Sequence, residues 1–110
     1  MAIDLNHPII VKMKEVYQRA HSANTDSYMN RNNIIEHSKK KKLFENYLNT
    51  IIKVKKEIEQ LIKKMAAETT IPSKVRASYI AFMKQHLKNV DGWLDETNKL
   101  FNKVSKSKKR

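Results

Sequence analysis

Two long stretches of strictly alternating apolar spacing constrain the fold of this chain more than any other feature. Between residues 44 and 65, and again between 80 and 104, an apolar residue (at one position a threonine) returns every three or four positions without a break. The members of the two series are Phe44, Tyr47, Ile51, Val54, Ile58, Leu61 and Met65, and then Ile80, Met83, Leu87, Val90, Leu94, Thr97, Phe101 and Val104. This spacing gathers side chains on one face of an α-helix. Each stretch therefore predicts one long helix with a continuous buried face.

A short segment rich in helix-breaking residues separates the two stretches. It runs from Thr69 to Ser73 and contains Pro72, which disfavours the helical conformation of the residue before it. Before the first apolar stretch, Asn33 and Glu36 have the spacing of a reciprocal capping pair, which predicts a helix start near Ile34. We therefore expect helices over about 34–68 and 72–104. Joined by so short a turn, they form an antiparallel helical hairpin.

A third, shorter helix is expected before the hairpin, over about 8–21. Its apolar residues recur at helical spacing, and Pro8 suits a first helical turn. The following segment, 22–33, is rich in Ser, Asn, Thr and Asp, whose side chains compete for the helical backbone. We expect a loop there, and the alternative that this segment forms a further helix stays open.

The expected fold class is therefore all-α, a three-helix bundle in which the shorter N-terminal helix packs along a long hairpin. A chain of 110 residues supports one domain, which we place at 1–104, followed by a flexible basic tail at 105–110. Association into a homo-dimer is one way for such a bundle to complete its core.

The positive charge of the chain is concentrated in two short clusters. Together they hold nine of the twelve units of net positive charge. The residues are Lys39, Lys40, Lys41 and Lys42 in the first cluster, and Lys103, Lys106, Lys108, Lys109 and Arg110 in the second. The rest of the chain is close to neutral, and a local concentration of this kind is typical of a contact surface.

The predicted hairpin brings these two clusters together. With its turn near residue 70, positions equally far before and after the turn lie side by side, so residues 39–42 lie near 98–101. The tail leaves from the same end, and Arg31 in the expected loop also arrives there. The lysine run lies in the early turns of its helix, where the helix dipole disfavours positive charge. Local stability does not explain the run, whereas an anionic partner does; the tail alone has the equally good explanation of solubility.

A second surface is predicted near the turn. A 14-residue first helix covers less than half of the hairpin, and if it covers the basic half, the apolar residues near the turn lack a third layer. They are Ile58, Leu61, Ile62, Met65, Val75, Tyr79 and Phe82. An uncovered apolar face of this kind indicates a partner helix or self-association.

Residue patterns that support catalysis are missing from the sequence. The chain has no cysteine and one glycine, and its four histidines share no metal-ligand spacing. We therefore expect no metal, no cofactor and no enzymatic activity. The sequence also lacks a signal-peptide pattern and an apolar run long enough to cross a membrane, so we expect a cytoplasmic protein.

Two functions fit these features. The first is non-enzymatic binding of nucleic acid, DNA or RNA, by lysine contacts with phosphates and largely independent of sequence. Tyr28 could stack on an unpaired base, although packing or a solvent-facing position is the more ordinary role for such a residue. The alternative is a helical adaptor, chaperone or inhibitor that binds a protein through the apolar face near the turn. Attachment to anionic membranes is the weakest option, because the tail carries no apolar anchor.

Overall fold

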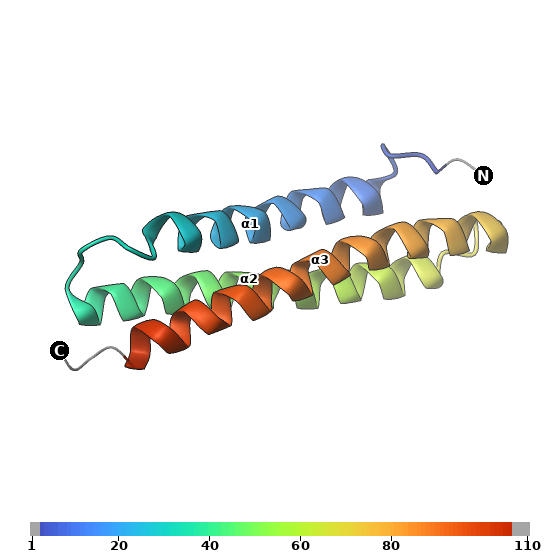
Figure 1. Ribbon diagram of the computed structural model, residues 1–110. Helices are drawn as coiled ribbons and strands as arrows, with labels where there is room; N and C mark the ends of the chain where they lie inside the picture. The colour runs from blue at the N-terminus through green and yellow to red at the C-terminus, as the bar shows by residue number, and fades with distance from the viewer. Residues whose placement is uncertain (1–2, 107–110) are drawn as a thin grey trace.

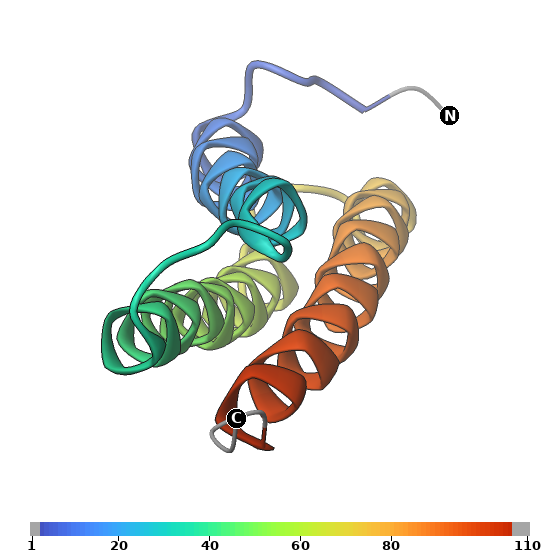
Figure 2. The same ribbon diagram turned by 60° about the vertical axis from the view of Figure 1, so that its left-hand side comes forward.

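The computed structural model describes residues 3–106, and side chains as far as residue 105. It contains three helices: α1 (Pro8–Asn30), α2 (His37–Ala66) and α3 (Ser73–Lys106). They run side by side along a rod of 59 × 18 × 17 Å, with α1 and α3 both antiparallel to α2 (Figure 1). Seen closer to the rod axis, the helices occupy the corners of a triangle (Figure 2). The all-α three-helix bundle is confirmed.

Helix α1 is longer than its apolar residues alone predict, and the expected loop at 22–33 is wrong over residues 22–30. The helix begins at Pro8, where the His7 ring accepts a hydrogen bond from the Ile9 amide at 3.1 Å. It continues because the three- and four-residue spacing of its buried face persists in smaller side chains. These buried residues are Met13, Val16, Ala20, Ala23 and Ser27. The polar residues here stabilise the helix rather than compete with it, since the Ser27 hydroxyl and the Asn30 amide donate to carbonyls of the same helix.

Helix α2 begins three residues later than predicted, at His37 instead of Ile34. Asn33 does not cap it: its side chain donates to Asn30 at the end of α1. Glu36 takes the capping position, but its side chain makes no capping hydrogen bond. Residues 31–36 therefore form a short connection between two helices.

The buried face of helix α3 is rotated toward α1 relative to the face that its apolar series marks. Its most buried residues are Tyr79, Met83, Val90, Thr97 and Val104. The ring of Tyr17 in α1 lies 4.6 Å from the His86 ring and 5.0 Å from the Trp93 ring, measured between centroids. As a result Ile80, Leu87 and Leu94 are only half-buried.

The expectation of an uncovered apolar face near the turn does not hold, because α1 covers this half of the hairpin. The Tyr79 hydroxyl accepts a hydrogen bond from the Asp4 backbone at 3.0 Å, and its ring lies 5.4 Å from that of His7. Ile58, Leu61 and Met65 in α2 are buried as well. The first helix starts in the half of the rod that contains the turn and extends past the middle (Figure 1), so α1 and the residues just before it supply the third layer there.

The half of the core farther from the turn contains buried polar side chains. Asn24 donates to the Thr97 hydroxyl at 3.3 Å and to the Glu96 carboxylate at 3.4 Å. Ser27 and Thr97 are fully buried, and Asn24 is nearly so. These contacts fix the position of α1 against α3 at this level.

Candidate nucleic-acid interface

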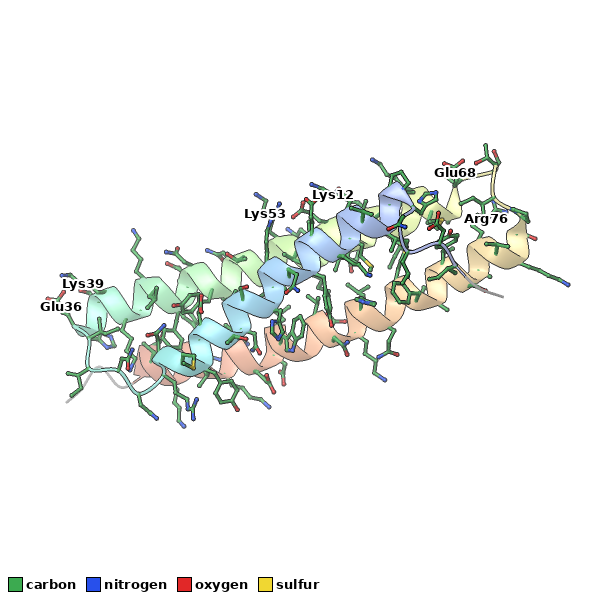
Figure 3. The ribbon with its side chains drawn as sticks, turned by 90° about the horizontal axis from the view of Figure 1, so that it is seen from above. Lys12, Glu36, Lys39, Lys53, Glu68 and Arg76 are labelled. Atoms are coloured by element: carbon green, nitrogen blue, oxygen red, sulfur yellow. The ribbon has the colours of Figure 1, made fainter. Side chains whose placement is uncertain are left out.

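One end of the rod gathers most of the net positive charge of the described residues, as the sequence predicts. We call residues 31–42 and 99–106 the basic end, and residues 3–8 and 61–80 the turn end. The basic end contains eight lysines and arginines against one acidic residue, whereas the turn end contains four against two. Figure 3 shows Glu36 and Lys39 at one tip of the rod and Glu68 and Arg76 at the opposite tip. The antiparallel order of the helices thus joins segments about 60 residues apart in sequence.

The four lysines at the start of α2 divide into two kinds. Lys39, Lys41 and Lys42 are exposed and have no hydrogen-bond or ion-pair partner among the residues that the structure describes. Lys40 is half-buried, and its ammonium donates to the backbone carbonyls of Arg31 (2.8 Å) and Asn33 (3.0 Å). Lys40 therefore holds the connection between α1 and α2 with two of its three N–H donors, and the other three lysines have all of their donors available to a partner.

Two neighbouring pockets open at this end. The Arg31 pocket, about 510 Å³, is lined by Arg31, His37, Lys40 and Lys103 together with the apolar Ile35 and Leu100. Its lining contains no carboxylate among the described residues. The Tyr28 pocket, about 450 Å³, is lined by Tyr28, Glu96, Lys99, Leu100, Asn102 and Lys103. Leu100 and Lys103 line both pockets, so the two adjoin each other.

An aromatic ring and a guanidinium stack beside these pockets. The Arg31 guanidinium carbon lies 4.4 Å from the centroid of the Tyr28 ring, a cation–π distance. The same guanidinium donates to the Tyr28 carbonyl at 2.6 Å. Tyr28 is nevertheless 46% exposed. Arg31 therefore fixes the ring and still leaves nearly half of the residue exposed.

The structure places the remaining predicted phosphate-binding residues as follows. Arg31 and Lys103 lie together in the Arg31 pocket, although they come from opposite parts of the chain. Lys106 is the last residue of α3, and its side chain lies outside the described part. Lys108, Lys109 and Arg110 lie outside the described residues.

Several residues at the basic end were missed by sequence reasoning. Lys99 and His37 line the pockets, and Met29 and Ile34 are exposed apolar side chains close by in sequence. Lys99 could have been found, because it lies one helical turn before Lys103 and so shares its face. The exposure of Met29 and Ile34 depends on where α1 ends and α2 begins, and the sequence misplaced both points.

The seven residues predicted as a protein interface near the turn are mostly inaccessible. Ile58, Leu61, Met65 and Tyr79 are buried, and Ile62, Val75 and Phe82 are half-buried. The four buried residues are covered by α1 and the residues just before it. The large apolar residues that are exposed in the described part are instead Leu5, Val11, Tyr28, Met29 and Ile34.

The pKa values of two side chains, Tyr47 and Glu68, are shifted by their surroundings. Burial raises the pKa of Tyr47 in α2, and the negative charge of Asp26 adds to this, whereas the hydrogen bond from Asn30 opposes it. At the turn end, hydrogen bonds from the hydroxyl and the backbone amide of Thr70 lower the pKa of Glu68. Glu68 is thereby tied to the turn between α2 and α3.

Neither a group of metal-binding side chains nor a membrane-spanning helix is found in the part of the chain that the structure describes. No three His, Asp or Glu residues within 3–106 lie close enough to hold a metal ion. No helix there is both long and apolar enough to cross a membrane. Compared with known proteins, the chain matches no family model, and no similar curated protein or solved structure is found.

Proposed function

We propose that this is a non-enzymatic helical protein that binds nucleic acid, DNA or RNA, through its basic end, largely independently of sequence. One observation carries the proposal. Arg31 directly follows α1, Lys40 lies near the start of α2 and Lys103 lies near the end of α3. All three line one pocket, whose lining contains no carboxylate. Cations that line one pocket repel each other, and an anion such as a phosphate relieves the repulsion.

The exposed lysines of α2 support the same function. Lys39 lies in the first turn of α2, where the helix dipole disfavours a positive charge, and this turn contains no acidic residue. Lys39, Lys41 and Lys42 are exposed and lie outside the buried core. Lysines in this position attract phosphates as point charges, which favours binding without base recognition.

The test is affinity for oligonucleotides across a salt series. We expect the logarithm of the association constant to fall linearly with the logarithm of salt concentration between about 50 and 200 mM. The triple variant Lys39→Ala/Lys41→Ala/Lys42→Ala should reduce the steepness of this line by about 2, since each lost phosphate contact contributes about 0.7 to 0.9.

A matched control removes the same charge from another part of the same helix. Lys53, Lys63 and Lys64 are also exposed lysines of α2, but they lie toward the middle and the turn end. Their triple alanine variant should bind almost as the wild type does. Absence of binding at low salt, or equal losses in the two triple variants, would contradict the proposal.

A protein partner is the second candidate, and a specific observation favours it. Met29 is 74% exposed and Ile34 fully exposed, and both lie at or beside the basic end. An acidic protein with an apolar groove would bind both kinds of group. Because part of this contact is apolar, the candidate predicts a complex that loses less affinity at high salt than nucleic-acid binding does. The complex should also be weakened in the Ile34→Ser variant, which removes the apolar side chain without changing the charge.

Self-association is supported by a surface that α1 does not cover. Two shallow grooves of about 410 Å³ each run between α2 and α3, and their linings contain no α1 residue. Their apolar members are the half-buried Leu48, Ile52, Ile62, Leu87 and Leu94. Analytical ultracentrifugation of the wild type and of Ile52→Lys tests a homo-dimer through this face. A dimer that dissociates in the variant supports it, and a monomer in both contradicts it.

A further inference from the structure

Tyr28 differs from the other tyrosines of the chain. The hydroxyls of Tyr17, Tyr47 and Tyr79 accept hydrogen bonds from Asn89, Asn30 and the Asp4 backbone, respectively. The Tyr28 hydroxyl has no hydrogen-bond partner among the described residues, and the residue is 46% exposed. The fold therefore uses three of its tyrosines for packing and leaves Tyr28 on the surface at the basic end.

The ring of Tyr28 is nonetheless held in place. Arg31 stacks on it at 4.4 Å and is itself fixed by a hydrogen bond to the Tyr28 carbonyl. The Tyr28 pocket has Tyr28 but not Arg31 in its lining, so Arg31 stacks on the ring without closing this pocket. An aromatic surface fixed in this way loses little conformational entropy when a flat partner stacks on it.

The two pockets differ in the charge that they accept. The Tyr28 pocket combines the aromatic ring and Leu100 with Glu96, whose carboxylate disfavours a phosphate but can accept a hydrogen bond from the amino group of a base. The Arg31 pocket combines Arg31, Lys40 and Lys103 without a carboxylate, which favours a phosphate. Since the pockets share Leu100 and Lys103, a flat polar group and an anion can occupy them side by side.

We propose that the basic end binds single-stranded nucleic acid, with an unpaired base stacked on Tyr28 in the Tyr28 pocket and an adjoining phosphate in the Arg31 pocket. This inference rests on the nucleic-acid binding proposed above and names its substrate class. In a duplex the bases are stacked inside the helix and do not reach a side pocket. The basic end therefore binds a single strand more tightly than a duplex of the same sequence.

The test compares a labelled single strand of about 12 nucleotides with the corresponding duplex by fluorescence anisotropy at low salt. Tyr28→Ala should weaken single-strand binding roughly five- to a hundredfold, because stacking on an aromatic side chain contributes that much per base. The steepness of the salt dependence should stay unchanged, since no charge is lost. Tyr28→Phe should retain most of the affinity, and binding of the duplex should not respond to either variant.

Met29→Ala is the matched control. Met29 is the neighbouring exposed side chain, yet it lines neither pocket, so this variant should bind as the wild type does. Equal affinity for single strand and duplex, or an unchanged single-strand affinity in Tyr28→Ala, would overturn the inference. If the triple lysine variant still weakened binding in that case, the nucleic-acid function itself would stand. Absence of binding to either oligonucleotide would overturn both.

Discussion

The turn end and the basic end are built from the same helices but differ in how completely they are closed. At the turn end Met65 and Tyr79 are buried under α1, and even the Tyr79 hydroxyl accepts a hydrogen bond. At the basic end α1 stops at Asn30, and three of the five large apolar residues exposed in the described chain lie at or near it: Tyr28, Met29 and Ile34. Positive charge is also far denser there. One end thus serves stability, and the other presents groups that folding does not use.

The largest expected contrast is in core packing. Met65 is fully buried at the turn end, so Met65→Ala should lower the free energy of unfolding by about 2 to 5 kcal/mol. Ile34 is fully exposed at the basic end, so Ile34→Ala should change it by less than about 0.5 kcal/mol. Urea denaturation followed by circular dichroism measures both. Similar losses in the two variants would show that the ends do not differ in this way.

The second contrast concerns the buried polar residues, Asn24, Ser27 and Thr97, which lie toward the basic end. Asn24→Ala should cost about 1 to 2 kcal/mol, because the Thr97 hydroxyl loses its hydrogen-bond donor in a buried position. The double variant Asn24→Leu/Thr97→Val should recover most of this loss, since both polar groups are then removed. Denaturation curves of the single and double variants test this, and a double variant less stable than the single one would contradict it.

The third contrast is smaller and arises from the dipole of α2. Lys39 lies in its first turn and Lys64 in its last. Lys39→Ala should raise the free energy of unfolding by a few tenths of a kcal/mol, and Lys64→Ala should lower it by a similar amount. Both effects should shrink as salt is added. Thermal unfolding at low and high salt gives the measurement, and the same sign in both variants would contradict this electrostatic explanation.

The smallest contrast is in the response to pH. The pKa of Glu68 is lowered by Thr70, so its contribution to stability is present above the unfolded pKa of about 4.3 and is lost as the pH falls through the folded pKa. The pKa of Tyr47 is raised by burial, so its contribution is present below the unfolded pKa of about 10 and is lost as the pH rises through the folded pKa. A Thr70→Val variant should raise the pKa of Glu68 and leave that of Tyr47 unchanged. NMR titration of the two side chains measures this; an unshifted Glu68 would contradict it.

The sequence predicted the parts of the fold that depend on long apolar periodicity. The hairpin of α2 and α3 and the meeting of the lysine run with Lys103 both follow from the regular spacing on either side of Pro72. The predicted end of the first helix was wrong because the buried face of α1 continues through small and polar residues, Ala23, Asn24 and Ser27. These bury well only against a close neighbour such as Thr97.

That single error changed the predicted surfaces. Because the longer α1 begins in the half of the rod that contains the turn, α1 and the residues before it cover the expected apolar face at Met65 and Tyr79. Three of the five exposed large apolar residues, Tyr28, Met29 and Ile34, instead lie at or near the end that carries the charge. The different role of Lys40 within the lysine run could not be predicted from the sequence either. Its hydrogen bonds to the carbonyls of Arg31 and Asn33 depend on the path of the connection between α1 and α2.

The most direct test of the account is to map the binding site on the folded protein. Amide chemical shifts would be followed by ¹H–¹⁵N NMR while a single-stranded oligonucleotide is added at low salt. We predict changes concentrated in residues 28–42 and 96–106, with the amides of 61–80 unaffected. Changes centred on the turn end, or spread evenly along the rod, would contradict the claim that the basic end is the contact surface.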